Sequence, residues 1–392
     1  MREYSTEINI SNSDLFKKGR PLVGRLDIEL TERCNNDCIH CCINLPENDE
    51  SAKKKELSTD EWKKIIQEVA DLGGMTIRFT GGEPLLREDF KELYLFTRKL
   101  GIRVMLFTNA RLITPELAEF LAAYPPREKI EVTVYGMQPK SYDAVVRVKG
   151  AFEEFWRGIH LLLEKKIPFV VKSAFLPQNK EDMEEFEAFA ATIPWMDRPP
   201  SYSMFFDLRC RRDDEAKNRL IQRNRLSPEE GLKILTRDKE KYLKGMKEFC
   251  SKFMRPPGNK LFSCGAGHGG GCVDAYGNLQ LCLMLRHPDT VYNLKKGSIK
   301  DAMTNFFPEM QKKEPKNPEY LKRCEKCFLK GLCEQCPAKS WNETGTLDTP
   351  VEYLCDIAHA QAEYLGLVEK GEKGWEVGEW KARIARLADK RA

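Results

Sequence analysis

The sequence predicts an α/β protein built on a partial, TIM-like (β/α)6 barrel, followed by a cysteine-rich C-terminal region. Six short runs rich in β-branched and aromatic residues alternate with helical patterns between residues 25 and 207, as expected for a parallel sheet covered by helices. Eight such units close a barrel, so six predict an open, partial one. Fourteen cysteines, nine of them from residue 250 onward, predict a second region held together by bound metal.

The predicted strands are short, and helical patterns lie between them. Ser58 and Glu61 have the spacing of a capping box at a helix N-terminus, and Thr114 followed by Pro115 marks another. The six strands are Arg25–Leu30, Met75–Phe79, Ile102–Phe107, Ile130–Val134, Phe169–Lys172 and Tyr202–Phe206. The loops that follow these strands are therefore expected on one face of the barrel.

Composition excludes several classes of function. The chain of 392 residues has 64 basic and 60 acidic side chains, a balance that does not indicate a nucleic-acid partner. No apolar run is long enough to span a membrane, and the N-terminus lacks the apolar segment of a secretory signal. We therefore expect a cytoplasmic protein without a membrane partner. In that reducing compartment, clustered cysteines predict metal-binding thiolates rather than disulfides.

The chain divides into five predicted segments. They are an N-terminal extension (1–24), the barrel (25–207), a helical bridge (208–257), a cysteine-rich domain (258–358) and a C-terminal helical tail (359–392). The bridge ends at Arg255-Pro256-Pro257-Gly258, a linker signal. The basic run from Arg209 to Arg225 predicts a solvated helix face, and a groove for an acidic leader peptide is the alternative. Twenty-four residues are too few for a leader-binding domain, so a separate protein or the bridge and C-terminal segments would recognise any leader.

The first cysteine group directly follows the first predicted strand. Cys34, Cys38 and Cys41 have C-x3-C-x2-C spacing, and such a loop can present three thiolates to an iron–sulfur cubane while one iron stays open to a small molecule. Cys42 is not expected to be a fourth ligand, because adjacent side chains on extended backbone point apart. A zinc loop completed by His40 or a distant residue is the alternative.

Glycine and polar residues follow the other strands and should meet this cysteine loop. Gly81-Gly82-Glu83-Pro84 comes after the second strand, Thr108-Asn109 after the third and Ser173 after the fifth. The glycines would let the backbone approach a ligand, and Glu83 can pair with an ammonium group. Taken alone, the GGEP segment would be interpreted as a tight turn.

The two motifs together resemble those of the radical S-adenosylmethionine (radical SAM) superfamily. CNNDCIHC fits its C-x3-C-x-aromatic-C motif, with His40 in the aromatic place, and GGEP is its second motif. The resemblance implies a [4Fe-4S] cluster on Cys34, Cys38 and Cys41 whose open iron chelates S-adenosylmethionine. Reductive cleavage of that cofactor would release a 5′-deoxyadenosyl radical. The expected cofactor contacts are His40, Gly81, Gly82, Glu83, Pro84, Thr108, Asn109 and Ser173.

Eight further cysteines match the number needed for two four-ligand sites. Cys272 and Cys282 flank a predicted hairpin with a turn at Gly277. Paired C-x2-C knuckles alone favour a structural zinc site, so a zinc-ribbon binding module on an α/β scaffold is one alternative. The eight residues are Cys264, Cys272, Cys282, Cys324, Cys327, Cys333, Cys336 and Cys355.

This second pattern resembles the SPASM domain, a cluster-binding extension of many peptide-modifying radical SAM enzymes. By that resemblance, auxiliary site I has the ligands Cys264, Cys272, Cys282 and Cys336. Auxiliary site II has the ligands Cys324, Cys327, Cys333 and Cys355. The interval between Cys333 and Cys336 is one residue shorter than the SPASM form, and full ligation favours electron transfer over substrate binding. Cys42, Cys210 and Cys250 remain as buried apolar residues, with Cys210 the candidate to face the barrel cavity.

These resemblances predict an oxidoreductase with three [4Fe-4S] clusters and S-adenosylmethionine that modifies a peptide or protein side chain. Radical chemistry on a small molecule, such as a tetrapyrrole or an antibiotic precursor, is the alternative. The expected partners are the substrate and an electron donor such as flavodoxin or ferredoxin. Leu283 occupies the place of the catalytic aspartate of sulfatase-maturating relatives, which disfavours that activity, and the sequence identifies no general base.

Overall fold

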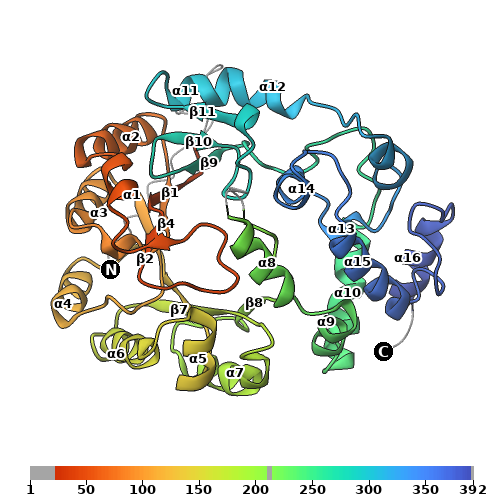
Figure 1. The fold of residues 1–392 in the computed structure, drawn as a ribbon, viewed down its shortest axis with the longest axis horizontal. Coiled ribbons are helices and arrows are strands. Elements are labelled where there is room, and N and C mark those ends of the chain that lie inside the picture. Colours follow the sequence, from red (N-terminus) through yellow and green to blue (C-terminus); the bar gives the residue numbers. More distant parts are fainter. Residues whose placement is uncertain (1–22, 210–213, 390–392) are drawn as a thin grey trace, which may run out of the picture.

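The computed structural model describes residues 23–209 and 214–389, and its sheet has the predicted strands (Figure 1). Six strands pair in parallel, each with the next along the chain. They are β1 (Arg25–Thr31), β4 (Thr76–Gly81), β5 (Arg103–Thr108), β6 (Ile130–Val134), β7 (Phe169–Ala174) and β8 (Ser201–Ser203). The partial α/β barrel predicted from the sequence is therefore confirmed.

Helices connect these strands and cover one face of the sheet (Figure 1). They are α1 (Glu50–Lys55), α2 (Thr59–Asp71), α3 (Phe90–Lys99), α4 (Pro115–Ala123), α5 (Pro139–Val146), α6 (Ala151–Glu164) and α7 (Met183–Thr192). Both predicted helix starts are confirmed: Ser58 and Glu61 form the capping box of α2, and the Thr114 side chain caps α4.

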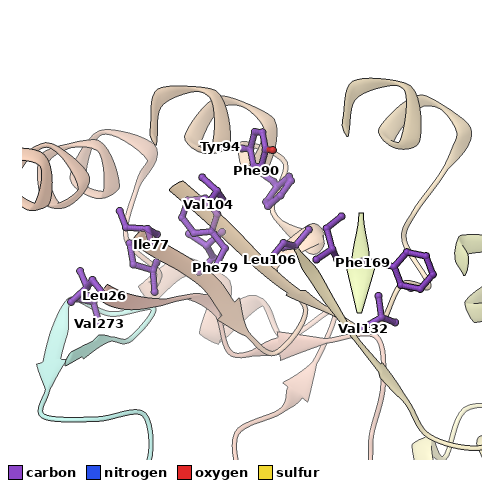
Figure 2. Close-up of a cluster of buried hydrophobic side chains, with 14 of the residues drawn as sticks. Leu26, Ile77, Phe79, Phe90, Tyr94, Val104, Leu106, Val132, Phe169 and Val273 are labelled. Atoms are coloured by element: carbon purple, nitrogen blue, oxygen red, sulfur yellow. The ribbon is translucent and has the colours of Figure 1, made fainter. Parts of the chain in front are cut away.

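The main core lies between the sheet and these helices. Because alternate side chains of a strand point to opposite faces, Leu26, Ile77 and Val104 all lie on the helix side and are fully buried. Figure 2 shows them gathered with Phe90 and Tyr94 of α3. This packing fixes the direction of every strand and thus where each βα loop emerges.

The opposite face of the barrel sheet carries charge. Asp27 of β1 pairs with Arg78 of β4, and Glu131 of β6 pairs with Lys172 of β7. The cations of Arg78 and Lys172 lie 4.5 and 3.7 Å from the centre of the Phe107 ring, within cation–π range. The inner face is thus polar, unlike the apolar filling of a closed eight-stranded barrel.

The predicted C-terminal hairpin extends the barrel sheet. β9 (Gly270–Val273) pairs in parallel with β1, and β10 (Asn278–Gln280) and β11 (Val291–Asn293) follow in antiparallel order. The result is one nine-stranded sheet with β8 and β11 at its edges. At the seam, a Cβ on Gly270 would lie 1.9 Å from the carbonyl oxygen of Arg25, so glycine permits the close pairing. Strands from the cysteine-rich segment thus cover the edge that β1 would otherwise expose.

The remaining elements are short strands and helices. β2 (Arg33–Cys34) and β3 (Leu45–Pro46) bracket the first cysteine loop. The bridge contains α8 (Glu215–Arg223), α9 (Pro228–Leu235) and α10 (Lys239–Phe253). After it come α11 (Ile299–Asp301), α12 (Phe307–Gln311), α13 (Lys330–Cys333), α14 (Pro337–Thr344), α15 (Glu352–Leu365) and α16 (Trp380–Asp389). Among the described helices, none has the length and apolar content needed to cross a membrane.

The basic run of the bridge is only partly the solvated face predicted from the sequence. Arg219 and Arg223 are exposed, as expected. The prediction is wrong for Arg209, Lys217 and Arg225, whose side chains are at most 8% exposed and form inward ion pairs. A charged residue can be buried when a partner offsets its desolvation, and sequence alone does not reveal such partners. Arg211, Arg212 and Cys210 lie outside the described residues.

Candidate metal and cofactor sites

The first cysteine group lies on the loop that leaves β1 at its carboxyl end. Backbone hydrogen bonds tie this loop to the end of α5: the Asp37 amide donates to the Val146 carbonyl and the Ile39 amide to the Val145 carbonyl, each at 3.0 Å. Figure 1 shows the loop beneath the barrel strands, close to α8. The three cysteines are thus held at the mouth of the barrel, as the strand order predicts.

Burial dominates the chemistry of these thiols. Cys38 is 4% exposed, and Cys34 and Cys41 are half-buried. Removal from water raises the pKa of all three thiols, and the charges of the neighbouring cysteines raise it further. Three desolvated sulfur donors on one loop suit a bound metal, which binds thiolates and removes their protons. The residues present therefore fit the [4Fe-4S] cluster that the motif implies.

The two glycines of GGEP let two backbone segments come into contact. The Gly82 amide donates to the Thr31 carbonyl at 2.8 Å, and the Glu83 amide donates to the Arg33 carbonyl at 2.9 Å. A Cβ on Gly81 or Gly82 would lie 2.2 Å from the carbonyl oxygen of Thr31 or Arg33, respectively. The glycines thus hold the GGEP segment directly against the chain that enters the cysteine loop.

Glu83 is a fully buried carboxylate that accepts hydrogen bonds from neutral donors. The Leu85 amide, the Thr108 hydroxyl and the Asn109 amide donate to its two oxygens at 2.9 to 3.1 Å. Burial raises the pKa of Glu83 to about 7 despite these hydrogen bonds. A carboxylate positioned in this way is suited to bind the ammonium group of a ligand, which would supply the missing positive charge.

The other predicted cofactor contacts lie around the cysteine loop or at the ends of neighbouring strands, and each has its own partners. Asn109 donates from Nδ2 to Asn35 of the cysteine loop at 2.7 Å. His40 packs against Tyr135 and Phe206, with ring centres 5.6 and 4.8 Å away, and burial lowers its imidazole pKa to about 4. The Ser173 hydroxyl donates a hydrogen bond to the Val134 carbonyl at 2.7 Å. Pro84 opens a short 3₁₀ turn, Pro84–Leu86, that directs Glu83 inward.

Two buried cations that the sequence analysis did not identify hold the cysteine loop from opposite sides. The Lys217 Nζ of α8 donates to the Cys38 carbonyl at 2.5 Å and to the Asp37 carboxylate at 3.0 Å. Arg111 donates to the Asn36 side chain at 2.6 Å. The sequence spacing could have indicated that Lys217 is buried. Lys217 lies one helical turn before the buried Ile221, so both share the inner face of α8.

Auxiliary site II is a preformed cavity. All four predicted cysteines line one pocket between α13, α15 and the chain before them. Burial raises the pKa of these thiols, and the charges of the other cysteines in the group raise it further for Cys324, Cys327 and Cys333. Arg323 also lines the cavity and donates to the Cys355 sulfur at 3.7 Å. The four residues therefore fit a cluster at this position.

Auxiliary site I brings together three of its four predicted cysteines. Burial raises the pKa of the Cys282 and Cys336 thiols; the charges of Cys336 and Cys264 raise that of Cys282 further, and the charge of Cys264 raises that of Cys336. Cys272 lies in β9 opposite Asp27 of β1, so its side chain is on the charged face of the sheet. The charged groups with the largest effects on Cys272 are Glu29, Arg286, Asp27 and Asp274. Unlike Cys282 and Cys336, Cys272 has no other cysteine of the predicted site I among the groups with the largest effects on its pKa.

This arrangement predicts different effects for two cysteine substitutions. Cys282→Ser should lose about four irons per reconstituted chain, because a ligand of one cubane is removed, whereas Cys272→Ser should keep the wild-type iron content. Anaerobic iron and sulfide analysis measures both. Equal iron loss in the two variants would show that Cys272 joins the site when the cluster is assembled.

Two further described cysteines, Cys250 and Cys42, lie outside the predicted cluster sites. Cys250 is fully buried in an apolar cluster, as predicted, and Cys42 is half-buried. Within residues 23–209 and 214–389, no three histidine, cysteine or acidic side chains are grouped so as to hold one metal ion. The cysteines of auxiliary site II are grouped by the pocket that they share. Those of the first loop and of site I are grouped by the effects of their charges on the pKa of neighbouring thiols.

Comparison with known proteins identifies the barrel. Residues 28–190 match the family model described as the radical SAM superfamily. The chain is 28% identical to the AdoMet-dependent heme synthase of Methanosarcina barkeri over 343 residues, which is 81% of this chain and 92% of that protein. It is 34% identical to the mycofactocin maturase MftC of Mycolicibacterium smegmatis over 181 residues, 45% of this chain and 44% of the maturase.

Similarity of fold extends beyond the barrel. The structure of Streptococcus suis SuiB bound to its precursor peptide SuiA matches with a TM-score of 0.62, covering 86% of this chain and 76% of SuiB at 16% identity. The similarity therefore reaches into the cysteine-rich region. The cysteine loop at the barrel mouth and Glu83 both lie within residues 28–190, the part of the chain that matches the radical SAM superfamily, and the similarity to named enzymes supports an enzyme.

Proposed function

We propose that the protein binds three [4Fe-4S] clusters and S-adenosylmethionine and oxidatively modifies a peptide or protein side chain. The observation that carries this proposal is the group formed by the Cys34–Cys41 loop and Glu83, which unites one buried and two half-buried thiols with one buried carboxylate. When bound there, the cluster and cofactor supply a 5′-deoxyadenosyl radical that takes a hydrogen atom from the substrate.

The chain's own residues would bind the cofactor and keep water away from it. Glu83 offers a desolvated carboxylate to the methionine ammonium group. His40, Tyr135 and Phe206 form an aromatic wall beside the cysteine loop. Lys217 and Arg111 restrain the loop, so that its thiols keep their positions when the substrate enters.

The auxiliary sites support an oxidative outcome. Loss of a hydrogen atom leaves one electron to be removed, together with a proton, before a cross-link or similar bond is complete. Site II, with four thiols around one cavity, has the ligand set of an electron-transfer cluster. Site I would hold its cluster through Cys264, Cys282 and Cys336, without requiring Cys272, the fourth ligand that the sequence predicts.

A peptide substrate is favoured by the fold shared with peptide-bound SuiB and by the similarity to the maturase MftC. A tetrapyrrole substrate is the second candidate, because the match to the heme synthase spans 92% of that protein. The polar inner face of the barrel, with its Asp27–Arg78 and Glu131–Lys172 pairs, accommodates a polar substrate of either kind.

Anaerobic reconstitution followed by product analysis tests the proposal. We expect about twelve irons per chain and formation of 5′-deoxyadenosine on reduction with dithionite. Peptides encoded beside the gene should lose two hydrogen atoms by mass spectrometry. Conversion of an iron porphyrin instead would select the second candidate. Two or three zinc ions without iron, and no 5′-deoxyadenosine, would refute the proposal in favour of a zinc-ribbon module.

A further inference from the structure

One stretch at the end of the bridge helices carries a marked positive charge. Residues 241–260, the end of α10 and the segment after it, contain six basic residues and one acidic residue, a net charge of +5. The whole chain carries only +4, so the remainder is close to neutral. Five of the six cations are exposed: Lys241, Lys244, Lys252, Arg255 and Lys260.

A groove opens beside this stretch and leads to auxiliary site I. It has a volume of about 540 Å³, and Phe253, Arg255, Lys330 and Lys339 line it together with Cys264, Cys336 and Glu334, which pairs with Lys339. The Phe253 side chain is 53% exposed, one of the most exposed large apolar residues of the described chain. Cys264 is also exposed. The groove therefore combines an apolar contact, several cations and two thiols of one predicted cluster site.

We propose that this basic groove, lined by Arg255, Lys330 and Lys339, forms the docking surface for a small acidic electron-transfer protein together with the exposed cations of residues 241–260 that adjoin it along the chain. The inference rests on the proposed function, which requires a supply of electrons. A carrier seated here would be oxidised by one electron and the enzyme reduced by one. Electron transfer weakens steeply with distance, and Cys264 and Cys336 bring site I to the surface at this groove.

The composition of the surface fits such a transient partner. Opposite charge speeds the encounter and orients the partner without requiring tight binding, and electron-transfer encounters have small interfaces. The acidic peptide substrate is the competing occupant. The carrier is favoured because a substrate must reach the barrel mouth near β1, whereas α10 and α13 lie on the far side of the molecule from the barrel helices (Figure 1).

Charge reversal tests the proposal. The variant Lys252→Glu/Arg255→Glu/Lys260→Glu changes three exposed residues outside the cofactor sites. Lys53→Glu/Lys54→Glu/Lys55→Glu makes the same charge change on α1, at the opposite side of the molecule (Figure 1). Flavodoxin, an acidic carrier, is the probe. Its affinity for each reconstituted enzyme is measured by surface plasmon resonance at low and high salt, and 5′-deoxyadenosine formation is driven by reduced flavodoxin or by dithionite.

We expect the groove variant to bind flavodoxin about tenfold more weakly at low salt, and added salt to diminish this difference, because screening weakens the same attraction. Flavodoxin-driven turnover of the groove variant should fall, while its dithionite-driven turnover and both activities of the α1 variant stay at wild-type values.

Unchanged flavodoxin binding by the groove variant would overturn the proposal. So would loss of peptide affinity with carrier affinity unchanged, which would assign the groove to the substrate. Failure of dithionite to drive cleavage in the wild type would instead refute the proposed function, since carrier binding is measured independently.

Discussion

Alanine at Cys34, Cys38 and Cys41 together should remove about four irons per chain and abolish 5′-deoxyadenosine formation. The reason is local: the three thiols share one loop, and no other described cysteine is among the groups with the largest effects on them except Cys42. The measurement is anaerobic iron analysis combined with chromatographic detection of 5′-deoxyadenosine. Iron at the auxiliary sites should remain, because their cysteines lie in a separate part of the chain.

Cys42→Ala is the matched control for this prediction. Cys42 is adjacent to Cys41 and half-buried, so its replacement tests whether any thiol in the loop suffices. We expect it to retain iron and cofactor cleavage. If the triple variant kept wild-type iron content, or if Cys42→Ala lost as much iron as the triple variant, the assignment of the three ligands would be wrong.

Arg286→Met should destabilise the folded protein by about 3–5 kcal/mol at pH 8. Arg286 comes from the cysteine-rich segment and donates twice to the Glu29 carboxylate of β1, at 2.5 Å. Glu29 is fully buried, so the substitution would leave an uncompensated charge beneath the seam between β1 and β9. Chemical denaturation measures the change, and adding Glu29→Gln should restore part of the loss.

The size of this effect should depend on pH in a defined direction. Burial raises the pKa of Glu29 to about 7, although Arg286 opposes the shift. A raised folded-state pKa means that stability is lost as pH rises from about 4.5 through 7. Without Arg286 the pKa rises further, so the variant should lose more stability at pH 8 than at pH 5. Lys252→Met, which breaks an exposed pair with Glu248, should leave the stability close to the wild-type value, because solvent screens such pairs; an equal loss of stability in both variants would contradict this explanation.

Local sequence patterns were sufficient wherever the controlling interaction is short in range. The strands from Arg25 and Ile130 and the capping box at Ser58 follow from alternation and turn chemistry within a few residues. The spacing of Cys34, Cys38 and Cys41 places three donors on one loop whatever surrounds them. The order of the strands then set the face on which that loop meets Gly81-Gly82-Glu83.

Contacts between distant segments were decided by tertiary structure. Lys217 reaches the Cys38 carbonyl across 179 residues, and Arg286 reaches Glu29 across 257. In sequence, both resemble exposed helix or loop cations, because nothing nearby reveals a buried partner. Likewise, Cys272 seemed equivalent to the other site I cysteines until its pairing with Asp27 placed it on the charged face of the sheet.

The sequence by itself therefore determined the fold class and predicted the cysteine loop and its resemblance to the radical SAM superfamily, since each depends on spacing within one element or on strand order. Only the tertiary structure decided that the cysteine-rich segment completes the barrel sheet, that buried cations restrain the loop and that positive charge gathers at one groove. The physical reason is that desolvation and charge pairing depend on distance in space, which separation along the chain does not specify.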